Sequence, residues 1–195
     1  MMENNPFVQF ENWFNEAVAS PINEANAMII STADEHNQPS SRVVLLKGFN
    51  EKGFVFYTNY ESKKGQNLTQ NPQISILFFW DLLERQIRIE GVAEKLSFAD
   101  SEKYFQSRPK GSQIGAWASP QSMLIKSREV LDNNKQMLEE KFANEEKLPC
   151  PKHWGGYIVK PEYFEFWQGR SNRLHDRFIY EADEFDNWEM SRLAP

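Results

Sequence analysis

This chain of 195 residues contains many short apolar runs, rich in Val, Ile and Phe and separated by turn-forming residues. Runs of this length and composition are typical of β-strands. None approaches the roughly 18 apolar residues of a membrane-spanning helix. Groups of turn-forming residues divide the runs, most clearly 34–39 and 50–53. The strand candidates are residues 27–33, 40–49, 53–58, 73–80, 86–96 (with Gly91 a candidate bulge), 156–159, 163–167, 173–181 and 188–193.

Apolar residues at helical spacing indicate helices between these strands. The candidates are residues 7–19, 61–70, 98–106, where Ser97 and Asp100 fit an N-terminal capping pattern, and 122–143. The number of strands and the regular spacing of turns favour a mainly β chain with some α (α+β), an antiparallel β-barrel with helices packed outside. We expect one domain over residues 1–195, with 1–6 a flexible N-terminus.

Composition and charge exclude several classes of protein. Lys and Arg number 22 and Asp and Glu 28, so the net charge of −6 argues against a nucleic-acid surface. Aromatic residues make up 14% of the chain, which excludes a disordered protein. Cys150 is the single cysteine, and the first residues lack the basic and apolar regions of a signal peptide. We therefore expect a cytoplasmic protein without an intrachain disulfide. The histidines are far apart in sequence, so we expect no metal site.

The first two of four basic clusters lie in the N-terminal third. Arg42 and Lys47 differ in parity on the strand 40–49, so they serve one site only if the strand bends or if the ligands lie across its end. The alternative is a strand whose charged ends reach solvent. Lys63 and Lys64 follow Tyr57 and Thr58 where a strand ends and a helix begins. This environment suits a phosphate, although a solvated helix start is the alternative.

Two further clusters lie later in the chain. Tyr104, Arg108 and Ser112 match a phosphate monoester, or else form an ordinary polar loop. Alternation places Arg173, His175 and Arg177 on one strand face. They repel one another there unless an anion or a carboxylate lies among them, or unless the face is screened by solvent. Together the clusters suggest two phosphorylated aromatic ligands.

Several motifs in order resemble the pyridoxamine 5′-phosphate oxidase family. They are residues 42–47, 56–59, 83–86, 104–109, 112–117 and 167–177, and the final Arg192-Leu193-Ala194-Pro195. The resemblance covers residues 7–195. It implies an FMN-binding split β-barrel that works as a homodimer, with FMN at the subunit interface. It also implies oxidation of pyridoxine or pyridoxamine 5′-phosphate to pyridoxal 5′-phosphate by dioxygen, with hydrogen peroxide as product and ammonia from the amine.

The resemblance also implies the site residues. Arg173 and His175 would be catalytic. Substrate contacts would be Lys47, Tyr104, Arg108, Ser112, Arg173, Leu174 and His175. FMN contacts would be Arg42, Val43, Val44, Leu45, Leu46, Lys47, Tyr57, Thr58, Lys63, Lys64, Gln86, Gln121, Ser122, Trp167 and Arg177. No metal, nucleic acid or membrane is expected.

This sequence departs from the family pattern at two places. Position 63 is often Arg in the family and is Lys here, which keeps the charge but loses the bidentate fork. Many members begin with a longer arm that carries Arg and Tyr and covers the active site, whereas only 1–6 precede the first helix here. Closure is then looser or is made by another segment. Two alternative functions stay open: a split-barrel flavin oxidase of another ring substrate, of the phenazine type, and a non-catalytic flavin or pyridoxal phosphate binding protein.

Overall fold

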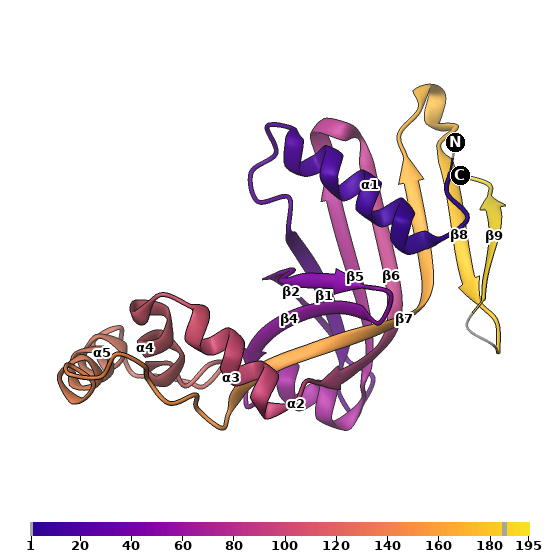
Figure 1. Ribbon diagram of the computed structural model, residues 1–195. Coiled ribbons are helices and arrows are strands. Elements are labelled where there is room, and N and C mark those ends of the chain that lie inside the picture. Colours follow the sequence, from indigo (N-terminus) through magenta and orange to yellow (C-terminus); the bar gives the residue numbers. More distant parts are fainter. Residues whose placement is uncertain (1, 185–186) are drawn as a thin grey trace.

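The computed structural model describes residues 2–184 and 187–195, which build a nine-stranded antiparallel sheet with helices around it (Figure 1). The strand order is β2-β1-β5-β6-β7-β4-β3, and β8 and β9 extend the sheet from β7. The strands are β1 (Ala27–Ala33), β2 (Pro39–Leu45), β3 (Gly48–Asn50), β4 (Gly53–Asn59), β5 (Gln73–Trp80), β6 (Arg85–Lys95), β7 (Trp154–Gln168), β8 (Asp176–Ala182) and β9 (Trp188–Leu193). The helices are α1 (Pro6–Ala19), α2 (Lys63–Gln70), α3 (Phe98–Ser107), α4 (Lys110–Ala118) and α5 (Glu129–Lys141), with short 3₁₀ turns at Asp81–Leu83 and Ser171–Arg173.

The main core lies between α1 and the curled sheet. Phe10 of α1 is fully buried, and its ring centroid lies 4.8 Å from that of Phe54 and 5.2 Å from that of Phe78. Asn5 caps the helix by accepting a hydrogen bond from the Phe7 N–H. The aromatic content of the chain therefore serves mainly to fill this core, which fixes the strands that carry the site residues.

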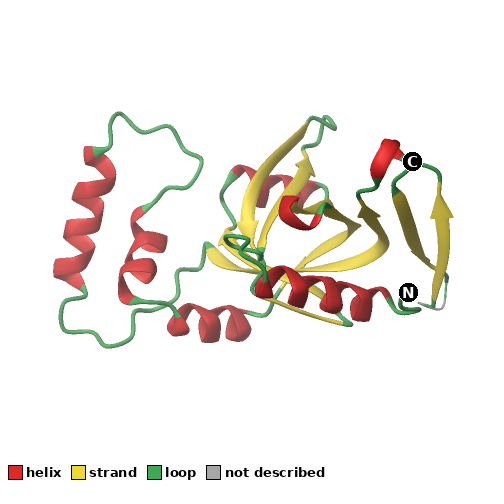
Figure 2. Cartoon of the chain, turned by 90° about the horizontal axis from the view of Figure 1, so that it is seen from above, coloured by secondary structure: helices red, strands yellow, loops and turns green. Residues whose placement is uncertain are grey.

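A second, smaller core joins the helical arm, formed by α3, α4 and α5, to the sheet. It contains Phe105, Ile114, Phe142, Leu148, Cys150 and Trp154. Figure 2 shows α4 and α5 standing apart from the sheet at the far end of this arm. Burial raises the pKa of the Cys150 thiol to about 11, as expected of an inert thiol.

Strand β7 is one strand of 15 residues, not the two expected at 156–159 and 163–167. Pro161 lies within it, but the register between β6 and β7 shifts between Glu90 and Gly91 at this point. The shift forms the bulge expected at Gly91, where the missing N–H of proline is tolerated. A Cβ at Gly91 would lie 2.0 Å from the Lys160 carbonyl oxygen, so the close approach requires glycine.

Two other expectations about elements were wrong. The strand 40–49 is two strands, because β2 ends at Leu45 and β3 begins at Gly48. The helix expected at 122–143 begins only at Glu129, since Ser122 has a φ of 70° and cannot continue a right-handed helix. Helix α4 was missed because its glycines indicated a loop. The single domain over 1–195, with 1–6 flexible, stays a prediction. No helix in the described part of the chain is both long and apolar enough to cross a membrane.

Candidate active site

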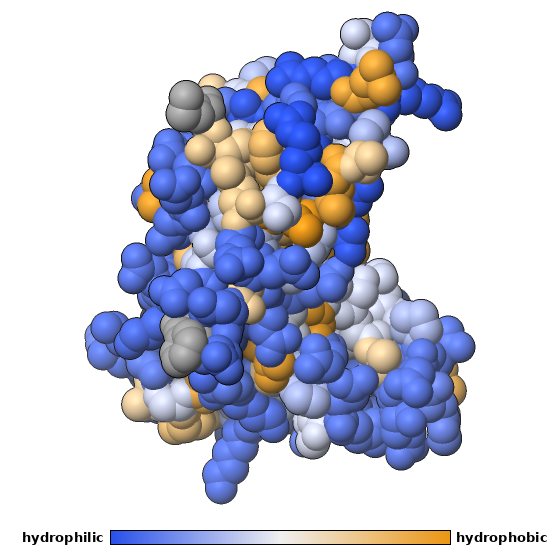
Figure 3. All heavy atoms as spheres, turned by 90° about the vertical axis from the view of Figure 1, so that its right-hand side faces the viewer, coloured by the Kyte–Doolittle hydropathy of each residue, from blue (hydrophilic) through white to orange (hydrophobic). Residues whose placement is uncertain are grey.

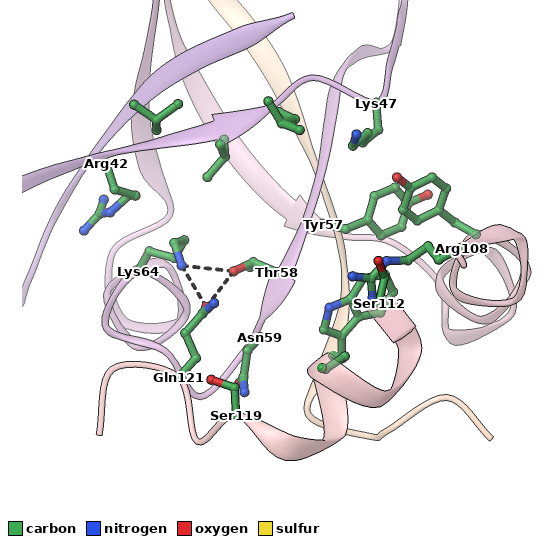
Figure 4. A pocket seen from close by; sticks show the side chains of 17 residues that line it. Arg42, Lys47, Tyr57, Thr58, Asn59, Lys64, Arg108, Ser112, Ser119 and Gln121 are labelled. Atoms are coloured by element: carbon green, nitrogen blue, oxygen red, sulfur yellow. Dashed lines mark hydrogen bonds between the residues drawn. The ribbon is translucent and has the colours of Figure 1, made fainter. Parts of the chain in front are cut away.

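A cavity of about 670 Å³ opens between the barrel and the helical arm (Figure 4). Strands β2 and β4, helices α2, α3 and α4 and the start of β7 supply its walls. Its lining residues are Arg42, Val43, Val44, Leu45, Lys47, Tyr57, Thr58, Asn59, Lys64, Tyr104, Arg108, Ser112, Gly115, Ala116, Ser119, Gln121 and Trp154. Twelve of the residues expected to bind ligands are thus brought together in one place.

Lys64 supplies a buried charge at one end of this cavity. Its Nζ donates to Thr58 Oγ1 at 3.0 Å, to Gln121 Oε1 at 3.0 Å and to Ser62 Oγ at 3.2 Å, all neutral oxygens. Burial and, to a smaller degree, the charge of Arg42 lower the pKa of Lys64 to about 8. An ammonium held without a counter-charge in this way favours the arrival of an anion.

Arg42 lies at the same end of the cavity, and its side chain also donates hydrogen bonds to neutral oxygens only. Its guanidinium donates to Thr32 Oγ1 at 2.8 Å, to the Ser40 carbonyl oxygen at 2.9 Å and to Ser40 Oγ at 2.7 Å. These neutral acceptors fix the orientation of the side chain and leave its charge uncompensated. Burial lowers the pKa of Arg42, but arginine stays charged at any physiological pH.

The other end of the cavity carries Arg108, with Ser112 and Lys47 nearby (Figure 4). The Arg108 guanidinium lies 4.7 Å from the centroid of the Trp154 ring, and its buried Nη1 has no hydrogen-bond partner among the described residues. A buried donor left without an acceptor is costly, so this group is suited to a bound anion. Beside it, the Tyr57 and Tyr104 rings stack with centroids 3.9 Å apart.

The two ends together define the electrostatics of the cavity. Four cationic side chains line it, at Arg42, Lys47, Lys64 and Arg108, and none of its lining residues is Asp or Glu. The cations form two groups on opposite sides, as Figure 4 shows. A cavity with cations at both ends fits two phosphate groups, or a phosphorylated cofactor beside a phosphorylated substrate.

The break between β2 and β3 explains how Arg42 and Lys47 reach one cavity despite their opposite parity. The strand ends at Leu45, and the Lys47 N–H then donates to the Val55 carbonyl oxygen of β4 at 2.8 Å. Leu46 between them turns into the core, where it is 5% exposed, and it does not line the cavity. A bend of this kind was one of the two conditions that sequence parity left open.

Lys63 and Ser122 also lie outside the cavity lining, although each adjoins a residue within it. Lys63 is exposed at the first position of α2, whereas Lys64 next to it points inward. Ser122 is exposed in the loop that follows Gln121. Their contacts with FMN stay a prediction.

A second group of the expected site residues lies on another part of the sheet. In the strand register, Gln86 of β6 pairs with Trp167 of β7, which pairs with Arg177 of β8. Directly paired residues of antiparallel strands point to the same face, so these three side chains form one row across the sheet. None of them lines the cavity described above.

Arg173, Leu174 and His175 lie in the turn before this row. The strand expected at 173–181 begins only at Asp176, and Arg173 has a φ of 60° in a short 3₁₀ turn. The prediction that Arg173, His175 and Arg177 alternate along one strand face was therefore wrong. The His175 ring packs 4.6 Å from the Trp167 ring, and its Nδ1 accepts the backbone N–H of Arg170 at 3.1 Å. In neutral His175 the proton is then on Nε2, which remains the available donor.

The two groups lie toward opposite ends of β7, which runs from the helical arm to β8 (Figure 1). Trp154 lines the cavity at the start of β7, and Trp167 lies near the end of that strand. At about 3.3 Å per residue, the path between them along the strand is roughly 40 Å. Within one chain, the expected residues thus fall into two groups, one that lines the cavity and one that does not.

Sequence reasoning missed several residues of the cavity. Asn59 is the last residue of the motif 56–59, so its place in that motif is a signal that was available. Trp154 is distant from every other motif, and nothing in its surroundings indicated a role. Gly115, Ala116 and Ser119 belong to the missed helix α4 or its end.

Comparison of the fold defines the class of protein first. The structure superposes with a TM-score of 0.75 on an FMN binding protein of Nostoc punctiforme described as pyridoxamine 5′-phosphate oxidase-related. The two share 18% identity and cover 100% of each chain, which establishes a common fold. This chain is thus a split β-barrel of that fold class, as the sequence predicted.

The family follows from the sequence comparisons. The family model described as pyridoxamine 5′-phosphate oxidase matches residues 14–136, and the model described as the pyridoxine 5′-phosphate oxidase C-terminal dimerisation region matches residues 154–195. The chain belongs to the pyridoxamine 5′-phosphate oxidase family.

Individual relatives support the same assignment. A pyridoxine/pyridoxamine 5′-phosphate oxidase of Gloeothece citriformis is 54% identical over 98% of this chain and 89% of its own length. The same enzyme of Bordetella pertussis is 53% identical over 98% of this chain and 90% of its own. PhzG from Burkholderia lata, solved in complex with tetrahydrophenazine-1-carboxylic acid, has a TM-score of 0.92 and 30% identity, covering 99% of this chain and 94% of its own.

Proposed function

We propose that this chain is an FMN-dependent oxidase that converts pyridoxine 5′-phosphate or pyridoxamine 5′-phosphate to pyridoxal 5′-phosphate. Dioxygen accepts the electrons and becomes hydrogen peroxide, and the amine substrate also takes up water and releases ammonia. The observation that carries this proposal is the cavity with cations at two ends and no acidic residue in its lining. Relatives that are 53–54% identical over nearly the whole chain carry the same name.

The residues at the Lys64 end fit the phosphate of FMN. A phosphate there would replace the missing counter-charge of Lys64 and Arg42, and Thr58 and Gln121 add polar side chains beside it. When bound, FMN supplies the redox chemistry, for which the side chains of the cavity provide only binding, orientation and electrostatics.

The residues at the Arg108 end fit the phosphate of the substrate. The unpartnered Nη1 of Arg108 and the hydroxyls of Ser112 and Tyr104 offer donors to its oxygens. This end discriminates between phosphorylated and unphosphorylated rings, because a substrate without phosphate would leave a buried guanidinium without an acceptor.

The site is completed, in this proposal, by a second copy of the chain, with FMN at the subunit interface. The row Gln86, Trp167 and Arg177 and the turn at 173–175 of one subunit would face the cavity of its partner. Two observations support this: the two groups lie toward opposite ends of β7, and residues 154–195 match a dimerisation region. The side of the molecule that carries β8 and β9 mixes apolar with hydrophilic surface (Figure 3). Leu174, in the turn before β8, is 71% exposed.

Arg173 and His175 are the residues proposed to contact the reacting part of the substrate. The Arg173 side chain is exposed and would orient the substrate as a charged donor. His175 would donate a hydrogen bond from Nε2, because its Nδ1 already accepts the Arg170 N–H. This tautomer favours an orienting donor over a general base. The fixed geometry of the two rings, not a covalent nucleophile, is what the protein contributes.

The experiment that tests the function is turnover by the purified protein. It should be yellow and should form pyridoxal 5′-phosphate and hydrogen peroxide from pyridoxine 5′-phosphate in air. Tight FMN binding without turnover of either substrate would contradict the proposal and favour a binding protein. Equal turnover of an unphosphorylated ring would favour the phenazine-type alternative.

A further inference from the structure

Glu165 is a buried carboxylate that the proposed function does not use. It lies on β7, and its side chain is 3% exposed. Among the residues that the structure describes, no other Asp or Glu is buried to this degree. Burying a carboxylate is costly unless it is paired and hydrogen-bonded, so its partners indicate what it does.

Two arginines and a tyrosine surround this carboxylate. Glu165 Oε1 accepts from Arg177 Nε at 2.7 Å, and Oε2 accepts from Arg88 Nη1 at 2.9 Å and from Tyr163 Oη at 3.3 Å. Burial alone would raise the pKa of Glu165, but the hydrogen bond from Arg177 and the charges of Arg177 and Arg88 lower it below its usual value. The carboxylate is therefore ionised at neutral pH.

Arg88 does not need Glu165 as its only counter-ion. It also forms an ion pair with Glu90 on the same strand, so the charges run Glu90, Arg88, Glu165, Arg177 and balance. Arg177, in contrast, has Glu165 as its one acidic partner among the described residues. Removing the Glu165 charge would affect Arg177 most.

The Arg177 guanidinium is held at two points. Nε donates to Glu165, and Nη1 donates to the Ala194 carbonyl oxygen at 3.0 Å. Nη2 makes no hydrogen bond within the described part of the chain. A planar guanidinium fixed at Nε and Nη1 has a set direction for its remaining donors. Arg177 thus presents a prearranged donor on the face that it shares with Trp167.

Register explains why Glu165 reaches Arg177. Arg177 pairs directly with Trp167, and Glu165 precedes Trp167 by two positions on the same strand. Residues two apart on a strand share a face, so Glu165 is the diagonal neighbour of Arg177. The diagonal distance suits the reach of an arginine side chain to a glutamate.

We propose that Glu165 is a positioning residue for the flavin site. Its carboxylate holds the Arg177 guanidinium in the orientation in which Arg177 contacts FMN. This inference depends on the proposed function, in which Arg177 contacts FMN bound in the cavity of the partner subunit. Glu165 itself touches neither FMN nor substrate in this proposal. Its effect on FMN passes entirely through Arg177.

A double-mutant cycle on FMN affinity tests this proposal. The dissociation constant of FMN is measured by quenching of flavin fluorescence in apoprotein of the wild type, Glu165→Gln, Arg177→Met and the double variant. Glu165→Gln should weaken FMN binding roughly tenfold, as expected for losing one charged partner of a buried hydrogen bond. In the Arg177→Met background the same change should alter FMN affinity less than about twofold.

The control is Glu94→Gln, which removes an exposed carboxylate of the neighbouring strand β6 that pairs with Lys160 at 2.7 Å. It should leave FMN affinity unchanged. Glu165→Asp keeps the buried charge but shortens its reach, and it replaces Glu165→Gln in the same cycle if the latter does not fold.

The outcomes separate the two proposals. An equal loss of FMN affinity in both backgrounds would show that Glu165 acts on the fold alone and would overturn the inference, as would an unchanged affinity in Glu165→Gln. Failure of the wild-type protein to bind FMN would instead overturn the proposed function.

Discussion

Lys64 Nζ lies 3.0 Å from Gln121 Oε1, although 57 residues separate the two along the chain. This contact joins the start of α2 to the loop after α4 and closes one end of the cavity. It brings an ammonium and an amide together in a place where no acidic residue lines the wall. The charge of Lys64 thus has no acidic partner among the residues that line the cavity, and a bound anion would balance it.

FMN binding should take up a proton near pH 8. The pKa of Lys64 is lowered to about 8 in the ligand-free protein, and a bound phosphate would raise it again. At pH 8 about half of the sites are neutral, so binding should take up roughly half a proton per FMN. Calorimetric titration in buffers of different ionisation enthalpy measures this uptake. Its absence, or an affinity that does not fall as the pH rises above 8, would contradict the assignment of Lys64.

Lys64→Met should have opposite effects on stability and on binding. At neutral pH Lys64 is charged in both the folded and the unfolded protein, so the cost of its burial is fully present there. The free energy of unfolding therefore rises as the pH goes from about 8 toward 10.5, because the folded chain has then released a proton that the unfolded chain keeps. Above this range the cost of burying the charge is gone. The variant should raise the melting temperature of the apoprotein by a few degrees.

The same variant should weaken FMN binding by about 2–4 kcal/mol, since a buried charge pair is lost. Thr58 Oγ1 already donates to Gln121 Oε1 at 3.2 Å, so neither is left unpaired. Lys52→Met, in the exposed turn before β4, is the matched control and should change neither quantity. A destabilised apoprotein would show that Lys64 stabilises the fold.

Arg108→Met should raise KM for the phosphorylated substrate and leave FMN affinity nearly unchanged. Arg108 lies at the opposite end of the cavity from Lys64, and its buried Nη1 lacks a partner among the described residues. Loss of a charged hydrogen bond of about 1.5–3 kcal/mol corresponds to a rise in KM of roughly 10–150-fold. Steady-state kinetics with pyridoxine 5′-phosphate measure it. An unchanged KM would favour an unphosphorylated ring as substrate.

Subunit mixing should restore activity if the site is shared between subunits. Lys64→Met damages the cavity, and His175→Ala damages the group that the partner would supply. In a 1:1 mixture, half of the dimers are mixed and each of those has one intact site, so about a quarter of wild-type activity should return. Each variant alone, refolded in the same way, is the control. No recovery in mixed dimers, verified by mass, would place both groups in one subunit's site.

Local chemistry was predictable from the sequence. The cap at Ser97, whose side chain accepts the Asp100 N–H, the bulge at Gly91 and the strand at 73–80 all depend on a few neighbouring residues, and all were confirmed. Helix α4 was missed because glycine disfavours helices, and the tertiary contacts of Ile114 override that preference.

Most strand positions, the four basic clusters and the family could be inferred from the amino-acid sequence, because each is recorded in short stretches of the chain. Where strands break or join, and which charges meet, depends on the folded structure. Arg42 and Lys47 share a cavity because the chain breaks between β2 and β3, and Lys64 meets Gln121 through the fold. Arg177 lies elsewhere because β7 extends over 15 residues. Distance along a chain does not fix distance in space, and packing of the barrel against α1 and the helical arm sets the latter.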